Sequence, residues 1–231
     1  MLNRILDLLY PPKCPFCGEI LKENGICEKC RLEITKISEP RCMKCGKPIQ
    51  KEEEEYCFDC KKRKHEFEDG VSLWVHRPPV SDALYRFKYN GLRCYGKVFA
   101  REAADSFYDY LERREVEAFV PIPLSKKRYR NRGYNQAEIL AVELSDLTGI
   151  PVKNLLKRVK ETNPQKQLND KARKRNIQNA FAMNGPVFEK SVVLVDDIFT
   201  TGSTLDEAAK ILKREGVSKV YFLTISIGQG F

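Results

Sequence analysis

The sequence predicts an α/β protein: a mostly parallel sheet flanked by helices, preceded by a small N-terminal module held together by metal ions. From about residue 70 onward, strand-like and helix-like segments alternate, which is the pattern of a parallel sheet with both faces covered. Before residue 70, eight cysteines occur as four Cys-x-x-Cys pairs in polar sequence that has too few apolar residues to build a core unaided. We expect two domains, residues 1–68 and 69–231.

The first ten residues are apolar but contain Asp7 and lack a cleavage-type ending. We therefore expect a short packing helix there rather than a signal peptide. No stretch of the sequence approaches the roughly 20 apolar residues that are needed to span a bilayer. These features predict a cytoplasmic protein without a membrane-inserted segment.

The cysteines form an internal repeat with a period of about 28 residues, in which Cys-x-x-Cys-Gly is followed by Cys-x-x-Cys. Each pair can direct two thiolates at one ion, and two pairs complete a tetrahedral site. No open ligand position is evident, so the pattern predicts two structural zinc ions and argues against iron–sulfur clusters and redox dithiols. Either neighbouring or interleaved pairs could share an ion. The predicted ligands are Cys14, Cys17, Cys27, Cys30, Cys42, Cys45, Cys57 and Cys60.

The second domain is expected to alternate short apolar strands with amphipathic helices. Glycines at positions 149 and 216 mark two helix ends, and prolines at 121 and 123 mark the end of a strand. The expected strands are residues 71–75, 117–123, 192–195 and 220–227, and the expected helices are residues 96–114, 133–147 and 204–215.

Residues 192–205, with the sequence VVLVDDIFTTGSTL, carry the strongest functional signal. Two carboxylates follow a buried strand, at the sheet edge where open α/β sheets bind ligands. The hydroxyl-rich loop and the helix N-terminus that follow can cradle a phosphate. Carboxylates repel phosphate but can hold sugar hydroxyls, directly or through Mg²⁺. The plain alternative is an acidic turn before a capped helix, but the full order of residues favours a ribose 5-phosphate site. It comprises Asp196, Asp197, Thr200, Thr201, Gly202, Ser203 and Thr204.

The net charge of +9 is concentrated in residues 121–180, which contain 14 basic and 5 acidic residues. Such clustering indicates an anionic partner, although a merely solvated basic loop is the alternative. Arg132 suits a bidentate grip on phosphate oxygens, and Tyr129, Tyr134 and Phe181 suit base stacking. The polar stretch 157–176 fits a loop that closes over a substrate. The candidates for DNA or phosphate contact are Lys126, Lys127, Arg128, Arg130, Arg173, Lys174 and Arg175.

Residues 192–205 closely resemble the phosphoribosyl pyrophosphate (PRPP) motif of type I phosphoribosyltransferases. The wider pattern resembles the ComF family of competence-associated bacterial proteins. That resemblance is carried by PPKCPFCG (11–18), FKYNG (87–91), PIP (121–123), RGYNQ (132–136), DDIFTTG (196–202) and the series Gln167, Arg173, Asn176, Ala180 and Phe181. It implies a cysteine-finger module fused to a type I phosphoribosyltransferase fold, PRPP binding with Mg²⁺, a part in DNA uptake with its partner proteins, and affinity for single-stranded DNA.

Two functions fit these observations. In the first, an enzyme transfers phosphoribosyl from PRPP to an unknown acceptor, with Asp196 and Asp197 as the catalytic candidates. In the second, a DNA-handling protein keeps the fold as a ligand sensor or a binding platform. A phosphoribosyltransferase of nucleotide or base metabolism without a DNA role is the alternative. A PRPP-sensing gene regulator is disfavoured because no helix-turn-helix is recognisable.

Overall fold

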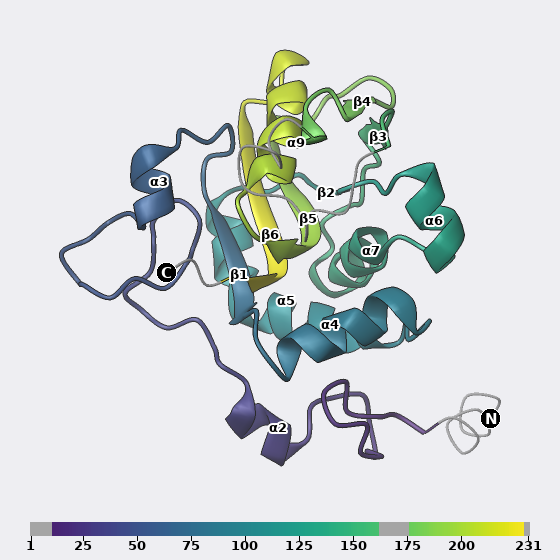
Figure 1. The fold of residues 1–231 in the computed structure, drawn as a ribbon. Coiled ribbons are helices and arrows are strands. Elements are labelled where there is room, and N and C mark those ends of the chain that lie inside the picture. Colours follow the sequence, from purple (N-terminus) through teal and green to yellow (C-terminus); the bar gives the residue numbers. More distant parts are fainter. Residues whose placement is uncertain (1–10, 162–175, 229–231) are drawn as a thin grey trace.

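The structure, a computed structural model, describes residues 11–161 and 176–228. The expectations for residues 1–10 and for Arg173, Lys174 and Arg175 lie outside the described residues. At the centre is a four-stranded parallel sheet in the order β1 (Gly70–Val75), β6 (Lys219–Ile227), β5 (Ser191–Phe199) and β2 (Ala118–Pro121) (Figure 1). The predicted parallel sheet is therefore confirmed.

Helices cover both faces of this sheet. One face packs against α4 (Val80–Tyr89), α5 (Tyr95–Arg113) and α7 (Gln136–Thr148), and the other packs against α9 (Ser203–Arg214). Successive side chains of β5 point to opposite faces, so its alternate valines and leucines join two separate apolar clusters. This double burial explains why the strand reads as a continuous apolar run rather than an alternating one.

The basic segment before α7 is a helix of its own, α6 (Lys126–Arg132), and not the solvated loop that the sequence left open as an alternative. The Ser125 hydroxyl caps its start, 3.4 Å from the Arg128 backbone nitrogen, and Gly133 ends it at φ 75°. Asn135 then caps α7 by accepting a hydrogen bond from the Ala137 backbone N–H at 3.2 Å. These local caps therefore divide residues 126–148 into two helices, whereas the apolar periodicity indicates only the second one.

Two further elements were not expected from the sequence. Helix α4 buries Val80, Ala83, Leu84 and Phe87, a spacing of three and four residues that is typical of an amphipathic helix. That signal was present and overlooked. The second element is an antiparallel pair formed by β3 (Leu156–Arg158) and β4 (Phe181–Met183). The expected loop 157–176 thus begins inside a strand, and residues 162–175 of it lie outside the described part.

The cysteine-rich module contains α2 (Glu28–Glu33) and α3 (Phe58–Lys62) and runs along the β1 edge of the sheet (Figure 1). The Val75 backbone N–H donates to the Thr35 carbonyl at 3.0 Å, so the chain between the two cysteine groups pairs with the edge strand. Phe16 packs against Trp74 with ring centroids 5.4 Å apart, and Phe67 packs against Phe222 at 4.9 Å. These two pairs belong to the two different apolar clusters, so the module packs against both faces of the sheet. It also covers the β1 edge, whose backbone groups would otherwise be unpaired.

No helix in residues 11–161 and 176–228 is long and apolar enough to cross a membrane.

Candidate functional site

A cavity of about 680 Å³ opens where β5 ends, between the start of α9 and the helices α4 and α6. It brings together most of the residues that the sequence singled out for PRPP, phosphate or DNA contact. Thr201, Lys126 and Arg130 are the described exceptions, because they do not line the cavity. The predicted residues that do line it are Asp196, Asp197, Thr200, Gly202, Ser203, Thr204, Lys127, Arg128 and Arg132.

The two carboxylates lie within β5, which extends four residues beyond its expected end because it stays paired with β6 up to Phe199. The Asp197 backbone N–H donates to Asp196 Oδ1 at 2.8 Å. The Lys88 ammonium forms an ion pair with the Asp197 carboxylate, whose side chain is only 14% exposed. The acid pair therefore lies on a strand that is paired with β6, and both residues line the cavity.

The two carboxyl groups have different pKa values. Burial, and next the neighbouring Asp197 charge, raise the pKa of Asp196 to about 8. Burial also acts to raise the pKa of Asp197, but the Lys88 ammonium outweighs it and holds that pKa below its usual value. Protonation is therefore favoured at Asp196 over Asp197. Such a pair can donate a hydrogen bond and accept others, which suits two adjacent sugar hydroxyls.

The hydroxyl-rich loop leaves the N-terminus of α9 open to the cavity. Gly202 occupies the N-cap position at φ 75°, and no side chain caps the helix. The first backbone N–H groups of this twelve-residue helix can therefore face an anion. Ser203 lines the cavity, and its hydroxyl, 3.0 Å from that of Thr201, adds a further donor. This geometry is that of a phosphate cradle.

Cations crowd the opposite wall of the cavity. Burial, and next the charge of Arg132, lower the pKa of Arg128. Burial, and next the charge of Arg128, lower the pKa of Arg158 to about 10. Like charges that are held together in a partly dry cavity favour a multiply charged anion between them. A group of the size and charge of pyrophosphate meets this requirement.

Five titratable residues that line the cavity were not among the predicted site residues: His76, Lys88, Tyr89, Arg158 and Glu161. Lys88 and Tyr89 lie within the FKYNG motif, which was noticed without a role being assigned to them. Arg158 and Glu161 lie in the stretch 157–176, which was expected to close over a substrate, but neither was named as a contact. No local pattern marks His76, which follows β1. Glu161 accepts a hydrogen bond from the Lys127 backbone N–H at 3.0 Å.

Two of the predicted stacking residues are not available to a ligand. Tyr134 and Phe181 are buried, with 5% and 4% exposure, and form part of the core, so the expectation that they stack on bases is wrong. Both are anchored by packing: the Tyr134 ring lies 6.2 Å from that of Phe87. Tyr129 is half exposed on α6 and remains a candidate.

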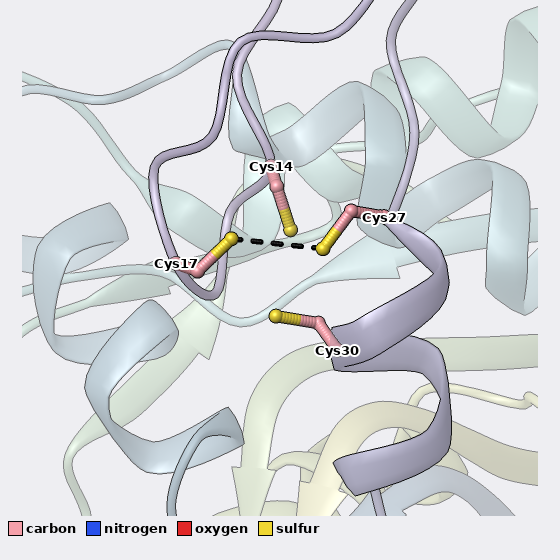
Figure 2. A group of neighbouring side chains, drawn as sticks. All are labelled: Cys14, Cys17, Cys27 and Cys30. Carbon is pink, nitrogen blue, oxygen red and sulfur yellow. Dashed lines mark hydrogen bonds between the residues drawn. The ribbon is translucent and has the colours of Figure 1, made fainter.

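The cysteine module forms two separate sites, each made from neighbouring Cys-x-x-Cys pairs. In the first, shown in Figure 2, four sulfurs converge within 4.8 Å of one another, and those of Cys17 and Cys27 lie 3.6 Å apart. A tetrahedral ion with Zn–S bonds of about 2.3 Å separates its sulfurs by about 3.8 Å, so these thiols fit zinc. The sequential arrangement is the one that the structure adopts. Its ligands are Cys14, Cys17, Cys27 and Cys30.

The second site repeats this geometry, with the sulfurs of Cys45 and Cys57 3.7 Å apart. Its other members are Cys42 and Cys60. Lys47 is buried beside it with its Nζ 2.7 Å from Asp59 Oδ2. Burial acts to lower the pKa of Lys47, but Asp59 and the nearby thiols outweigh it and raise that pKa. A buried cation here offsets part of the negative charge that four thiolates leave after binding one divalent ion.

Two families of known domains match separate parts of the chain. A double zinc ribbon domain matches residues 5–61, and a phosphoribosyl transferase domain matches residues 125–226. Competence protein F of Haemophilus influenzae is 34% identical over 217 residues, which cover 90% of this chain and 93% of that protein. The chain belongs to the Competence protein F family.

Other members of the ComF family match over similar lengths. Competence protein ComFC of Streptococcus pneumoniae is 29% identical over 90% of this chain and 96% of its own. DNA utilization protein YhgH of Salmonella typhimurium is 29% identical over 90% of this chain and 86% of its own. A purine phosphoribosyltransferase from Pyrococcus horikoshii superposes over 55% of this chain and 72% of that chain with a TM-score of 0.36 and 21% identity. The competence proteins confirm the expected ComF membership, and the two domain matches confirm its combination of a zinc ribbon with a phosphoribosyltransferase domain.

Proposed function

We propose that the cavity binds PRPP together with Mg²⁺ and that the protein uses this site in handling single-stranded DNA. One observation carries the proposal. The acid pair of β5, the uncapped N-terminus of α9 and a cluster of cations surround a single cavity. These are the three environments that a ribose with a phosphate on one side and a pyrophosphate on the other requires.

Each part of the ligand has a group that suits it. Backbone N–H groups and hydroxyls of residues 200–204 hold the 5-phosphate. Asp196 and Asp197 hold the ribose hydroxyls, and Arg128, Arg132 and Arg158 face the pyrophosphate. Mg²⁺, if bound, would be held through the oxygens of Asp196 and Asp197 and would supply positive charge that offsets the charge of the ligand.

The same arrangement suits phosphoribosyl transfer. Cleavage of the bond between the anomeric carbon and pyrophosphate leaves charge on the leaving group, and the arginines are placed to stabilise that charge. The anomeric carbon becomes oxocarbenium-like and takes its new bond from an acceptor nucleophile that the site must hold nearby. Transfer thus depends on position and electrostatics more than on a strong base. Release of pyrophosphate in the presence of candidate bases or DNA is the measurement that distinguishes turnover from binding.

The DNA role is supported by charge beyond the cavity. Lys126 and Arg130 are exposed on α6 and do not line the cavity, so a small ligand bound inside gains little from them. A polyanion that continues along α6 would neutralise both. Relatives are named as competence and DNA utilization proteins, which supports a place beside DNA-uptake proteins. A cytoplasmic location fits cysteines that must stay reduced to hold zinc.

The alternative is a phosphoribosyltransferase of nucleotide or base metabolism with no DNA role. The cavity favours it to the extent that three of the five cations of α6 line the ligand space. Titration of single-stranded DNA binding with salt separates the two functions. Contact with several phosphates predicts that log K falls with log salt by about 0.7 per contact. Absence of binding at low salt would leave the metabolic alternative.

The PRPP site itself is tested by isothermal titration with PRPP and Mg²⁺. We expect the wild type to bind and the double variant Asp196→Asn/Asp197→Asn to lose binding. Asp105→Asn is the matched control, since Asp105 is an exposed carboxylate of α5 that does not line the cavity. Equal affinity of the double variant and the wild type would rule out the proposed site.

A further inference from the structure

We propose that Tyr85 and Tyr89 of α4, together with Arg132 of α6, form a stacking subsite for the bases of a single DNA strand at the mouth of the cavity. This inference rests on the proposed DNA role and names the surface that performs it. The sequence motifs indicate no stacking role for Tyr85 or Tyr89.

The two tyrosines lie on the outer face of α4, one turn apart. Their ring centroids are 4.8 Å apart with a tilt of 45°, and each side chain is 54% exposed. The opposite face of the helix carries its buried residues and packs into the core. Core packing therefore does not explain these two aromatic rings, and their exposed surface is available to another planar group.

Arg132 extends this pair toward the cavity. Its guanidinium lies over the Tyr89 ring, 4.8 Å from the centroid, and its Nη2 donates to the Tyr89 hydroxyl at 3.0 Å. Its Nη1 donates to Gln136 Oε1 at 2.7 Å. The guanidinium is thus held in place from two sides. Arg132, Tyr89 and Tyr85 form a row of planar groups that starts at the lining of the cavity and ends on the surface.

The row is held against the cationic helix α6. The hydrogen bond from Arg132 to Tyr89 joins α6 to α4, and Arg93 Nη2 donates to the Gly133 carbonyl, at the end of α6, at 3.0 Å. The exposed Lys126, Tyr129 and Arg130 lie on α6. Planar stacking groups that contact a helix with exposed cations suit the bases and phosphates of a nucleic acid strand.

A single strand fits this surface better than a duplex or a free base. In a duplex the bases already stack on one another, so their faces are not available to tyrosine. A free base would use the tyrosines but leave Lys126 and Arg130 without a phosphate. A strand uses both sets of groups.

The test compares variants for binding to a short single-stranded oligonucleotide containing 2-aminopurine, whose fluorescence falls when it stacks. We expect Tyr85→Ala/Tyr89→Ala to lower the affinity at least tenfold and to abolish the quenching. The dependence of affinity on salt should stay as in the wild type, because the phosphate contacts remain. Lys126→Ala/Arg130→Ala should show the reverse: a shallower salt dependence with the quenching kept.

Two controls keep the result specific. Tyr89→Phe retains the ring and should keep the quenching. Tyr108→Ala removes a tyrosine of α5 that is 52% exposed and does not line the cavity, and it should bind like the wild type.

The possible failures are distinguishable. If the wild type binds no single-stranded DNA, the proposed DNA role falls and this subsite falls with it, whatever PRPP does. If the wild type binds DNA and Tyr85→Ala/Tyr89→Ala binds it equally well, only the subsite is refuted. Binding of duplex DNA as tight as that of the single strand, or displacement of the strand by free adenine at comparable concentration, would also overturn it.

Discussion

The imidazole Nδ1 of His65 lies 3.0 Å from Asp206 Oδ2, which joins the chain leaving the second cysteine site to the first turn of α9. The Glu66 backbone N–H donates to the same carboxylate at 3.0 Å, and Arg63 Nη1 donates to the Thr201 carbonyl at 2.8 Å. His65 is buried and stacks on Phe67, with ring centroids 4.6 Å apart. Residues 63–66, at the end of the cysteine module, therefore contact the loop and the first helical turn that we propose to bind phosphate.

Substitution of His65 should weaken ligand binding at a site that the imidazole does not line. We expect His65→Ala to lower PRPP affinity about tenfold, because loss of a hydrogen bond to a charged group loosens the first turn of α9. Glu66→Ala is the matched control, since Glu66 contacts Asp206 through its backbone. Isothermal titration measures both. Equal affinities for the two variants would show that the imidazole contact does not position the cradle.

Loss of one cysteine ligand should remove one zinc ion and loosen the module. We expect Cys57→Ser to retain one zinc per chain where the wild type holds two, and to melt at a lower temperature, because metal binding supplies folding energy to a segment with little core of its own. Cys94→Ser is the control, since Cys94 is exposed and belongs to neither site. Zinc released on thiol modification gives the count. A Cys57→Ser protein with two zinc ions would contradict the assigned ligands.

Gly202 is required both for its backbone conformation and for the space around it. Its φ is 75°, and a Cβ added there would lie 3.0 Å from His65 Cε1 and 3.2 Å from Phe199 Cζ. Gly149 has a φ of 77° with nothing within 4 Å, so Gly149→Ala shares only the backbone cost of about 1–2 kcal/mol. We expect Gly202→Ala to lower the free energy of unfolding by about 1 kcal/mol more than Gly149→Ala does, and to reduce PRPP affinity. Urea denaturation compares the two, and equal losses would show that the contact with His65 is unimportant.

The raised pKa of Asp196 should make the folded protein less stable as the pH becomes alkaline, because the buried carboxyl then loses its proton. Its pKa rises from 3.8 to about 8 on folding, chiefly through burial and next through Asp197. Between these values the folded chain holds a proton that the unfolded chain has released, so the free energy of unfolding falls as pH rises through this window. Asn keeps an acceptor for the Asp197 N–H without titrating.

We therefore expect Asp196→Asn to be more stable than the wild type by roughly 1–2 kcal/mol at pH 8 to 9, after allowing for water at the cavity mouth. The difference should shrink toward pH 4. Denaturation curves across this range measure it, with Asp105→Asn as the control. A constant difference across the range would show that Asp196 is already ionised in the folded protein. Because the same variant should bind PRPP more weakly, this position would trade stability for function.

The parts of the protein that could be predicted from sequence depend on neighbouring residues. The apolar run of β5 with Asp196 and Asp197, the glycine at position 202 and the paired cysteines are all contiguous patterns. Their consequences, a buried strand, an uncapped helix N-terminus and two four-cysteine sites, require little knowledge of the rest of the chain. The α/β fold and the ComF membership were correctly predicted for the same reason.

The remaining features depend on contacts between segments far apart in the chain. The ion pair of Lys88 with Asp197 and the proximity of Arg158 to Arg128 require the folded sheet. The hydrogen bond of His65 with Asp206 also requires the module to lie along the edge of the sheet. Tyr134 and Phe181, which were expected to stack on bases, are buried in the core. Tyr85 and Tyr89, to which the sequence assigned no role, are exposed. Local pattern determined which chemical groups the chain carries. Packing determined which of them face the cavity, because desolvation and proximity belong to the folded arrangement and not to any one segment.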